Sequence, residues 1–324
     1  MTRSRHISVS IDLDRVRDSA EQIRAATGVR LISVIKSDAY GLGAARVADA
    51  IASVSDDFAY FSIHEAREVA RPGIVLGPPE GDRAHYRELE LRPTVSNLTD
   101  AERFRGLRVA VNVDTGMQRF GCPAGMLDQV LRRSGADEAF THAGDPQSAE
   151  RLRELCGARV GLLHAAASSL LDYPEARLDA VRPGIALYRG AARITTRLTL
   201  VRETKGRVGY SGFQCRRVGV ILAGYSNHLR PGPVLINARR QWMLETGMNT
   251  TFVSVHREDR EGDEVVLLGD GISEAELGRL YNCREHEILC RYASMGQRSY
   301  VRSDAPTPRP TGAAATESIL RSRD

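Results

Sequence analysis

Short apolar segments recur along the first 190 residues and alternate with segments of helical periodicity. They span residues 31–35, 58–63, 73–77, 92–96, 107–113, 138–143, 159–164 and 180–188. The first, LISVI, is wholly apolar and rich in β-branched side chains, as in a strand buried on both faces of a parallel sheet. Eight strands in βα order close a barrel, so we predict an α/β fold with a TIM-like (β/α)8 barrel over residues 11–190.

Helices are expected between these strands, most clearly at residues 11–28, 42–53, 124–135 and 146–157. Between residues 73 and 105 the elements are short, and we expect a somewhat shortened barrel with one reduced βα unit. The alternative is an open doubly wound sheet, but no Gly-x-Gly-x-x-Gly sequence follows an early strand. The pattern therefore favours the barrel.

Beyond the barrel the sequence changes to alternating strand-like segments with little helix. We predict a mainly-β domain formed by residues 191–302 together with residues 1–10, with one helix near residues 273–282. Residues 303–324 are rich in Pro, Ala, Ser and Thr and are predicted to be a disordered tail.

Charge and cysteine content exclude several classes of protein. The 45 basic and 41 acidic residues are dispersed and leave a net charge of +4, so we expect no nucleic-acid partner. The five cysteines lack zinc-ligand spacing, which predicts reduced thiols and no metal site. Neither a signal peptide nor a membrane-spanning segment is recognised, so we expect a cytoplasmic protein without a membrane partner.

Reactive side chains follow several of the predicted strands, at the end of a barrel where catalytic residues gather. They are Lys36 after the first strand, Arg119 after the fifth, His142 after the sixth, His164 after the seventh and Arg182 in the eighth. Taken alone, a strand-end lysine is usually a solvated surface residue, and a strand-end histidine is usually a hydrogen-bonded core residue. Their joint occurrence at one end of a barrel indicates an active site.

A phosphate site is predicted beside them. Ser168, Gly184 and Ile185 lie around the last two strands, which is the usual phosphate-binding position in such barrels. The phosphate-bearing group that best suits a barrel lysine is pyridoxal phosphate, held as a Schiff base.

Six motifs then resemble the alanine racemase family of fold-type III pyridoxal-phosphate enzymes, in the same order. They are VIKSDAYGLG (34–43), VNVDTGMQRFG (111–121), RLDAVRPGIALYRG (177–190), VGYSGFQC (208–215), VGVILAGYSNHLRP (218–231) and GDEVVLLGDG (262–271). The resemblance covers about residues 6–302, nearly the whole chain.

The resemblance implies how the cofactor is held. Lys36 is expected to bind pyridoxal phosphate covalently, and Arg182 to face its pyridine nitrogen. The phosphate contacts are expected from Tyr40, Ser168, Gly184 and Ile185, with His142 beside the cofactor.

It also implies a two-base mechanism in a homodimer. Racemisation removes a proton from one face of Cα and delivers one to the other face, which two bases accomplish. Lys36 serves one face and Tyr210, from the partner subunit, the other. Arg119 is expected near the substrate carboxylate, with Tyr225 and Met248 at the substrate entrance. Alanine is the expected substrate.

Four positions depart from the family pattern. Asn112 replaces a lysine of many members, Ala167 a common asparagine, Asn249 an aspartate and Met295 a phosphate-binding tyrosine. Tyr292 is close to Met295, but if this segment is a strand an offset of three residues places it on the opposite face. Two alternatives therefore remain open: a family enzyme acting on another amino acid in a specialised pathway, or a non-catalytic dimer that binds pyridoxal phosphate.

Overall fold

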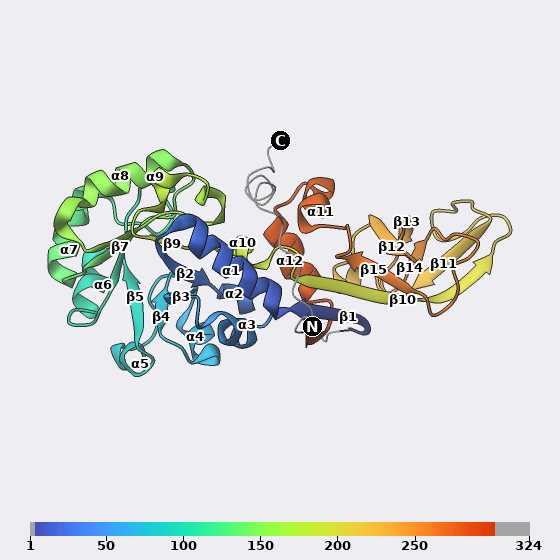
Figure 1. The fold of residues 1–324 in the computed structure, drawn as a ribbon, viewed down its shortest axis with the longest axis horizontal. Helices are drawn as coiled ribbons and strands as arrows, with labels where there is room; N and C mark the ends of the chain where they lie inside the picture. The colour runs from blue at the N-terminus through green and yellow to red at the C-terminus, as the bar shows by residue number, and fades with distance from the viewer. Residues whose placement is uncertain (1–3, 302–324) are drawn as a thin grey trace. The chain divides into compact units, whose positions relative to one another are not determined.

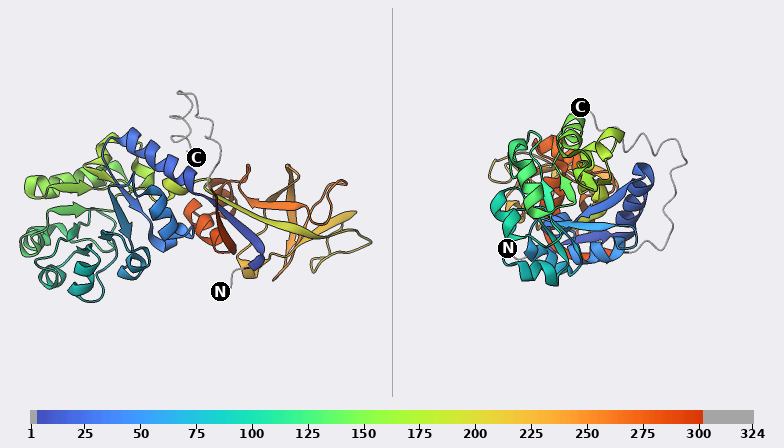
Figure 2. Two further views of the ribbon diagram at one scale, coloured as in Figure 1. Left: turned by 60° about the horizontal axis from the view of Figure 1, so that its bottom comes forward. Right: turned by 90° about the vertical axis from the view of Figure 1, so that its left-hand side faces the viewer.

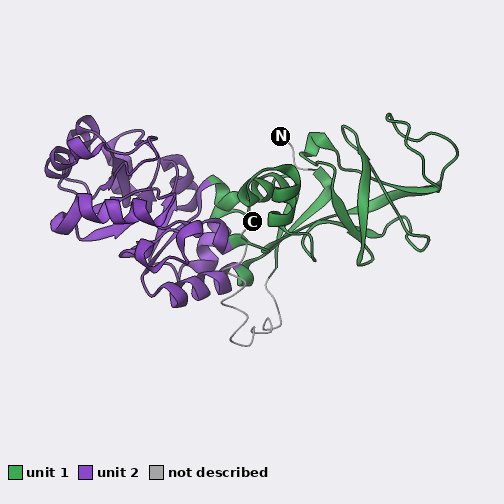
Figure 3. Cartoon of the chain, turned by 90° about the horizontal axis from the view of Figure 1, so that it is seen from above, with its two compact units in different colours: residues 1–15, 37–44, 188–301 green, residues 16–36, 45–187, 302–324 purple. Residues whose placement is uncertain are grey.

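The computed structural model describes residues 4–301 (Figure 1). Its chain divides into two compact units (Figure 3). Residues 16–36 and 45–187 form one unit, here called the barrel unit, and residues 4–15, 37–44 and 188–301 form the other, here called the β unit. The predicted domain boundaries at residues 10 and 190 remain predictions, and the predicted disordered tail at 303–324 lies outside the described residues.

The barrel unit contains a closed barrel of parallel strands, as predicted. Its strands are β2 (Arg30–Val34), β3 (Asp57–Tyr60), β4 (Gly73–Val75), β5 (Leu91–Val95), β6 (Ala110–Asn112), β7 (Glu138–Phe140), β8 (Leu162–His164) and β9 (Ala180–Val181). The ring closes where β9 pairs with β2, with Ala180 opposite Arg30 and Val181 opposite Leu31. Apolar side chains from most of these strands, among them Ile32, Ile74 and Phe140, form the core.

Helices lie outside the strands of this unit (Figure 2). They are α1 (Leu13–Thr27), α3 (Ala44–Ile51), α4 (Ile63–Val69), α5 (Arg83–Glu88), α6 (Leu98–Arg103), α7 (Leu127–Ser134), α8 (Pro146–Cys156) and α9 (Pro174–Arg177). Asn97 and Asp145 cap α6 and α8 by accepting hydrogen bonds from backbone N–H groups at 2.8 and 2.7 Å. Between residues 73 and 105 the elements are short but complete, so no βα unit is lost there.

The predicted strand at residues 180–188 is mostly wrong. Only Ala180 and Val181 form β9, and residues Ile185–Tyr188 form the short helix α10. Arg182 and Pro183 still make backbone hydrogen bonds, to Ala166 and Val34, but Pro183 has no N–H to donate and no strand ladder continues beyond it. The residues that follow β9 stay mostly buried, and the N–H groups of Gly184 and Ala186 donate to the Ser168 hydroxyl.

The β unit is built on a sheet with strand order β11-β14-β13-β12-β15-β10-β1-β16, in which β11 also pairs with β10. The strands are β1 (Ser4–Asp12), β10 (Ala192–Glu203), β11 (Arg217–Ile221), β12 (Pro233–Ile236), β13 (Arg239–Thr246), β14 (Thr251–Val253), β15 (Glu264–Leu268) and β16 (Gly296–Val301). As predicted, the N-terminal segment adds a strand: β1 pairs antiparallel with β10 and parallel with β16.

Two helices, α11 (Glu274–Tyr281) and α12 (Glu285–Ala293), precede β16. The first was predicted, whereas the interpretation of Tyr292 as a strand residue was wrong. Tyr292 lies near the end of α12, is buried, and its hydroxyl lies 3.3 Å from that of Tyr281. Met295 follows the helix and is also buried, at 2% exposure.

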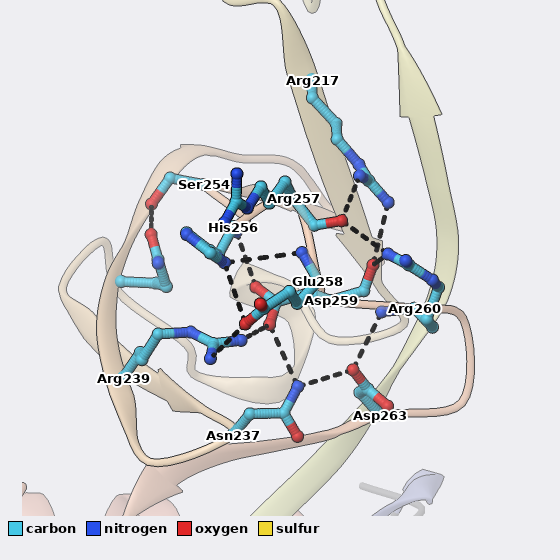
Figure 4. A network of polar contacts seen from close by, with 11 residues as sticks. Arg217, Asn237, Arg239, Ser254, His256, Arg257, Glu258, Asp259, Arg260 and Asp263 are labelled. Carbon is cyan, nitrogen blue, oxygen red and sulfur yellow. Dashed lines mark hydrogen bonds and ion pairs between the residues drawn. The ribbon is translucent and has the colours of Figure 1, made fainter.

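A polar network fixes the loop between β14 and β15 (Figure 4). The carboxylate of Asp259 is buried and accepts hydrogen bonds from Asn237 Nδ2 at 3.0 Å, Arg239 Nη2 at 2.6 Å and the His256 N–H at 2.7 Å. Burial raises the pKa of Asp259, but these hydrogen bonds lower it below its usual value.

Among the described residues, no helix has the length and apolarity needed to cross a membrane.

Candidate active site

The predicted residues of the barrel unit follow the carboxyl ends of its strands. Lys36 lies two residues beyond β2, His142 two residues beyond β7, and Arg182 directly after β9. Ser168 follows β8 by four residues. The closed parallel barrel therefore brings these four side chains to the same end, as the sequence pattern predicts. Lys36 is one of only two lysines in the sequence, and the other, Lys205, is exposed in a loop of the β unit.

The segment after Lys36 is a left-handed turn, labelled α2 (Lys36–Tyr40) in Figure 1. The φ angles of Ser37, Asp38 and Ala39 are 54°, 55° and 51°. This conformation costs L-residues about 1–2 kcal/mol each. Nothing in the sequence signals it, since these residue types are common in ordinary turns.

Asp38 stabilises this turn from both sides. Its Oδ1 accepts a hydrogen bond from the Ala44 N–H at 2.7 Å, and its Oδ2 forms an ion pair with Arg298 Nη2 at 2.5 Å. At Gly43, where φ is +97°, an added Cβ would lie 2.0 Å from the hydroxyl of Tyr300, so the position favours glycine. Asp38 and Arg298 thus hold the turn of residues 37–44 within the β unit, where Gly43 passes close to Tyr300.

His142 lies where the cationic side chains of the barrel unit converge. Burial, followed by the positive charges of Arg182, Arg119 and Lys36, lowers the pKa of His142 to about 4. Such an effect requires all three cations to lie within electrostatic reach of one imidazole. His142 is therefore neutral at neutral pH, in a site whose net field favours an anion.

Arg182 is buried, with 4% exposure, below this cluster. Its Nη2 donates to the carbonyl oxygen of Thr141 and, at 3.2 Å, to that of Ala165. Its guanidinium carbon lies 4.8 Å from the ring centroid of Phe140. Within residues 4–301, its Nε–H has no hydrogen-bond partner. A buried donor left in this way costs about 1–3 kcal/mol, which an acceptor supplied by a ligand would recover.

The charge of Arg182 is retained at neutral pH. Burial lowers its pKa to about 10, Glu138 raises it and Arg119 lowers it. A guanidinium with this pKa donates hydrogen bonds but does not give up its proton near pH 7.

Ser168 forms a small cradle with the backbone after β9. Its Oγ accepts hydrogen bonds from the N–H groups of Gly184 at 3.0 Å and Ala186 at 3.1 Å. The hydroxyl hydrogen of Ser168 is not used in either bond and can be donated to an anion. Ile185, also predicted, is the first residue of α10. Ala186 was not predicted, because no side-chain pattern reveals a backbone donor.

A buried charge network below the site was missed by the sequence reasoning. His164 is fully buried, its Nε2 lies 3.0 Å from Glu138 Oε1, and its ring stacks on Phe140 with centroids 5.3 Å apart. Glu138 also accepts from Arg92 Nε at 2.6 Å, and Arg92 pairs with Asp57. The available signal was a charged residue within each of two otherwise apolar segments, at Arg92 and Glu138.

Arg119 lies in an exposed loop whose backbone is held by Asp114. The Oδ1 of Asp114 accepts hydrogen bonds from the N–H groups of Gly116 at 2.9 Å and Gln118 at 3.1 Å. Gly121 passes so close to this loop that an added Cβ would lie 2.4 Å from the backbone nitrogen of Asp114. The motif DTGMQRFG therefore sets the loop that carries Arg119.

Tyr40 belongs to the β unit, as do the remaining predicted site residues. Its ring centroid lies 5.2 Å from that of Tyr188 and 6.5 Å from that of His286. Burial and the neighbouring Cys290 raise the pKa of Tyr40 to about 12. The phenol is consequently protonated and able to donate a hydrogen bond.

Tyr210, Tyr225 and Met248 are gathered around the end of β13. The carboxylate of Glu245 accepts the N–H of Tyr210 at 2.8 Å, and the carbonyl of Gly247 accepts the N–H of Tyr225 at 3.0 Å. The three predicted side chains are 97%, 57% and 58% exposed. Within the described residues, therefore, the β unit presents them outward on loops of defined backbone.

The chain is similar to known proteins over most of its length. The family model described as alanine racemase, N-terminal domain, matches residues 11–192, more than half of the chain. The alanine racemase of Halorhodospira halophila (strain DSM 244 / SL1) is 30% identical to this chain over 358 residues, which cover 92% of this chain and 98% of that protein.

Two solved structures share the fold. The biosynthetic alanine racemase from Pseudomonas aeruginosa has a TM-score of 0.83 at 24% identity and covers 92% of this chain and 100% of its own. The alanine racemase from Bartonella henselae, solved with covalently bound pyridoxal phosphate, has a TM-score of 0.82 at 18% identity with the same coverage. These likenesses confirm the predicted architecture of a barrel followed by a β domain.

Proposed function

This chain belongs to the alanine racemase family and is a racemase, an isomerase; on that premise we propose that it interconverts L- and D-alanine with pyridoxal phosphate as cofactor. The observation that carries the proposal is the buried Arg182 Nε–H, which has no partner among the described residues. The pyridine nitrogen of this cofactor is an acceptor of the required kind.

The residues present fit the aldehyde, the phosphate and the ring nitrogen of the cofactor. Lys36 supplies the amine that binds the aldehyde, and the Ser168 hydroxyl with the backbone at Gly184 and Ile185 suits the phosphate. Tyr40, a protonated phenol four residues after Lys36, is assigned to the same phosphate. When bound, the cofactor acidifies the Cα–H of an amino acid by withdrawing electrons.

Arg182 would limit how strongly the bound cofactor withdraws electrons from the amino acid. Its Nε–H would donate a hydrogen bond to the ring nitrogen, and because the guanidinium keeps its proton at neutral pH, it would not protonate the ring. His142, kept neutral by burial and by the neighbouring cations, adds no further positive charge beside the ring.

The chain's own groups move the protons. Lys36 Nζ exchanges a proton with one face of Cα, and the phenol of Tyr210 from the partner subunit exchanges one with the other face. Arg119, in its loop fixed by Asp114, binds the substrate carboxylate. Tyr225 and Met248 line the entrance.

A homodimer is part of the proposal. Tyr210 is 97% exposed, and Tyr225 and Met248 are more than half exposed, which is unusual for residues that serve a closed site within one chain. A second copy that covers them completes two equivalent sites by symmetry.

The five cysteines are all unpaired, which supports a location in the reducing cytoplasm.

One observation favours a second candidate substrate. At the position where the family pattern has aspartate, Asn249 accepts a hydrogen bond from Ser226 Oγ at 2.8 Å. The site therefore lacks one negative charge near the entrance, and a larger or acidic amino acid is the alternative substrate.

A screen by solvent deuterium exchange tests both candidates. The purified dimer, loaded with cofactor, is incubated with each of the common amino acids in deuterated water, followed by chiral analysis. We expect exchange at Cα and racemisation with alanine. If another amino acid exchanges and alanine does not, the second candidate substrate is selected. If the protein shows the absorption band of the bound cofactor but no amino acid exchanges its Cα proton, the protein is a non-catalytic dimer that binds the cofactor. That result overturns both candidate substrates.

The two lysines provide a matched control for the cofactor. Borohydride reduction followed by peptide mass spectrometry should place the cofactor on Lys36 and not on Lys205. Lys36→Ala should abolish the visible absorption band of the bound cofactor, whereas Lys205→Ala should retain it. Labelling of both lysines to the same extent would contradict a specific site.

A further inference from the structure

A cavity of about 680 Å³ opens at the opposite end of the barrel from Lys36. It is lined by the starts of several strands: Arg30 begins β2, Glu138 begins β7 and Leu162 begins β8. In barrel enzymes this amino-terminal end is not the catalytic end. The cavity is therefore separate from the site described above.

Its lining is dominated by guanidinium groups. The cavity is bordered by six arginines, namely Arg30, Arg92, Arg105, Arg108, Arg132 and Arg133. The acidic residues among its lining are Asp137 and Glu138. No lysine contributes, so the positive charges are all planar groups suited to paired hydrogen bonds with an oxyanion.

Three of these arginines are already neutralised by the protein. Arg92, in the floor, pairs with Asp57 and with Glu138. On the rim, Arg133 lies 2.9 Å and Arg105 lies 4.0 Å from the same carboxylate, that of Glu102. The carboxylates of Asp57, Glu138 and Glu102, all in the barrel unit, balance the charges of these three arginines.

The other three arginines of the lining are not neutralised by acidic residues. Within residues 4–301, the side chains of Arg30, Arg108 and Arg132 have neither an ion pair nor a hydrogen bond. They come from β2, from the segment before β6 and from α7, and all three line this cavity. Like charges held around one concave surface repel one another unless an anion lies between them.

We propose that this cavity binds a small polyphosphate, such as inorganic triphosphate or the triphosphate group of a nucleotide. Guanidinium groups recognise phosphate oxygens bidentately, and three uncompensated ones match a ligand with several phosphate charges. The volume lies within the range of about 300–1,000 Å³ typical of small-molecule sites. Asp137, also in the lining, offsets one of the three charges, so a ligand with one charge would still leave part of the repulsion in place.

Calorimetric titration of the full-length, cofactor-loaded protein tests the proposal. The probes are inorganic triphosphate, ATP and adenosine. Binding of both triphosphates but not of adenosine assigns the affinity to the phosphate chain. Tighter binding of ATP than of inorganic triphosphate identifies a nucleotide as the ligand, whereas equal affinity identifies the phosphate chain alone. Absence of binding by either triphosphate at millimolar concentration overturns the proposal.

Two triple variants distinguish the cavity from general surface charge. Arg30→Gln/Arg108→Gln/Arg132→Gln removes the three uncompensated charges of the cavity. Arg67→Gln/Arg87→Gln/Arg151→Gln removes three exposed arginines of the barrel helices that lie outside it.

We expect the cavity variant to weaken binding at least about tenfold and the control variant to leave it within about twofold. Equal weakening by both variants would show unspecific attraction and refute the site. All six side chains are exposed, and a thermal melt of each variant verifies folding. The single variant Arg132→Gln, on the surface of α7, repeats the test with the smallest change.

Discussion

The Nε2 atom of His164 lies 3.0 Å from the Oε1 atom of Glu138 inside the barrel. Burial raises the pKa of Glu138, but the hydrogen bond from His164 and the guanidinium of Arg92 lower it to about 2. Burial lowers the pKa of His164, so the imidazole is neutral and donates its Nε2–H. Glu138 is thus a buried anion between a neutral donor and a cation.

The first prediction concerns this buried anion. Glu138→Gln leaves Arg92 with Asp57 as its remaining carboxylate partner, and removing one member of a buried ion pair costs about 3 kcal/mol. We expect a reduction of that size in the free energy of unfolding, measured by urea denaturation. Glu150→Gln, which breaks an ion pair with Arg153 on the surface, is the control and should cost less than about 1 kcal/mol. Equal costs would mean that the buried network contributes nothing beyond a surface pair.

The second prediction concerns the pH dependence of stability at His142. Its pKa falls from about 6.5 when unfolded to about 4 in the folded protein, mainly through burial and then through nearby cations. Between these values the unfolded chain binds more protons than the folded one, so stability falls as the pH is lowered from 6.5 to 4. His142→Gln should flatten the pH dependence of the melting temperature in this window. An unchanged pH dependence in His142→Gln would contradict this assignment.

Much of the fold follows from the periodicity of the sequence. Apolar segments at regular spacing predict the eight parallel strands, because such strands are buried on both faces. The prediction fails at residues 182–188, where Pro183 ends a ladder that the apolar residues alone would extend. It fails again at α12, where Tyr292 was placed on a strand although its segment is helical.

The candidate site was predictable only where residue type carries the chemistry. Lys36 and Arg182 stand out at strand ends, but the pairing of Arg92 with Glu138 joins residues 46 positions apart. That contact depends on the register of the barrel, which a sequence pattern does not specify. The left-handed turn at Ser37 is equally hidden, because it is held by Arg298, far along the chain.

The third prediction addresses that turn. Asp38→Asn keeps an oxygen that accepts the Ala44 N–H but removes the ion pair with Arg298, at a cost of about 1–2 kcal/mol. Asp38→Ala loses both contacts and should cost more, with lower activity, since the turn directly follows Lys36. Urea denaturation and racemase assays should therefore rank wild type above Asn and Asn above Ala. Asp49→Asn, which breaks an exposed pair with Arg71, should match wild type; a similar loss there would argue against a specific role for the turn.

The fourth prediction separates the two proposed bases. Tyr210 is 97% exposed, so Tyr210→Phe should change the free energy of unfolding by less than about 0.5 kcal/mol. Loss of an acid–base group should nevertheless slow proton exchange from one enantiomer of alanine by about a hundredfold or more, and from the other far less. Tyr225→Phe removes the same atom from a neighbouring loop and should affect both enantiomers similarly. Equal losses from both enantiomers in Tyr210→Phe would exclude it as the second base.

The fifth prediction tests whether Tyr210 acts in the partner's site. When Lys36→Ala and Tyr210→Phe subunits are mixed and allowed to exchange, each mixed dimer contains one site that lacks both groups. If the tyrosine comes from the partner subunit, its other site contains an intact Lys36 and an intact Tyr210. Half of the dimers are then mixed and have one working site of two, so we expect about a quarter of the wild-type activity from two nearly inactive parents. If both groups came from one chain, every site in the mixture would lack one of them and no activity would return. Native mass spectrometry of the mixture, which resolves the mixed dimer by its mass, establishes that subunits have exchanged.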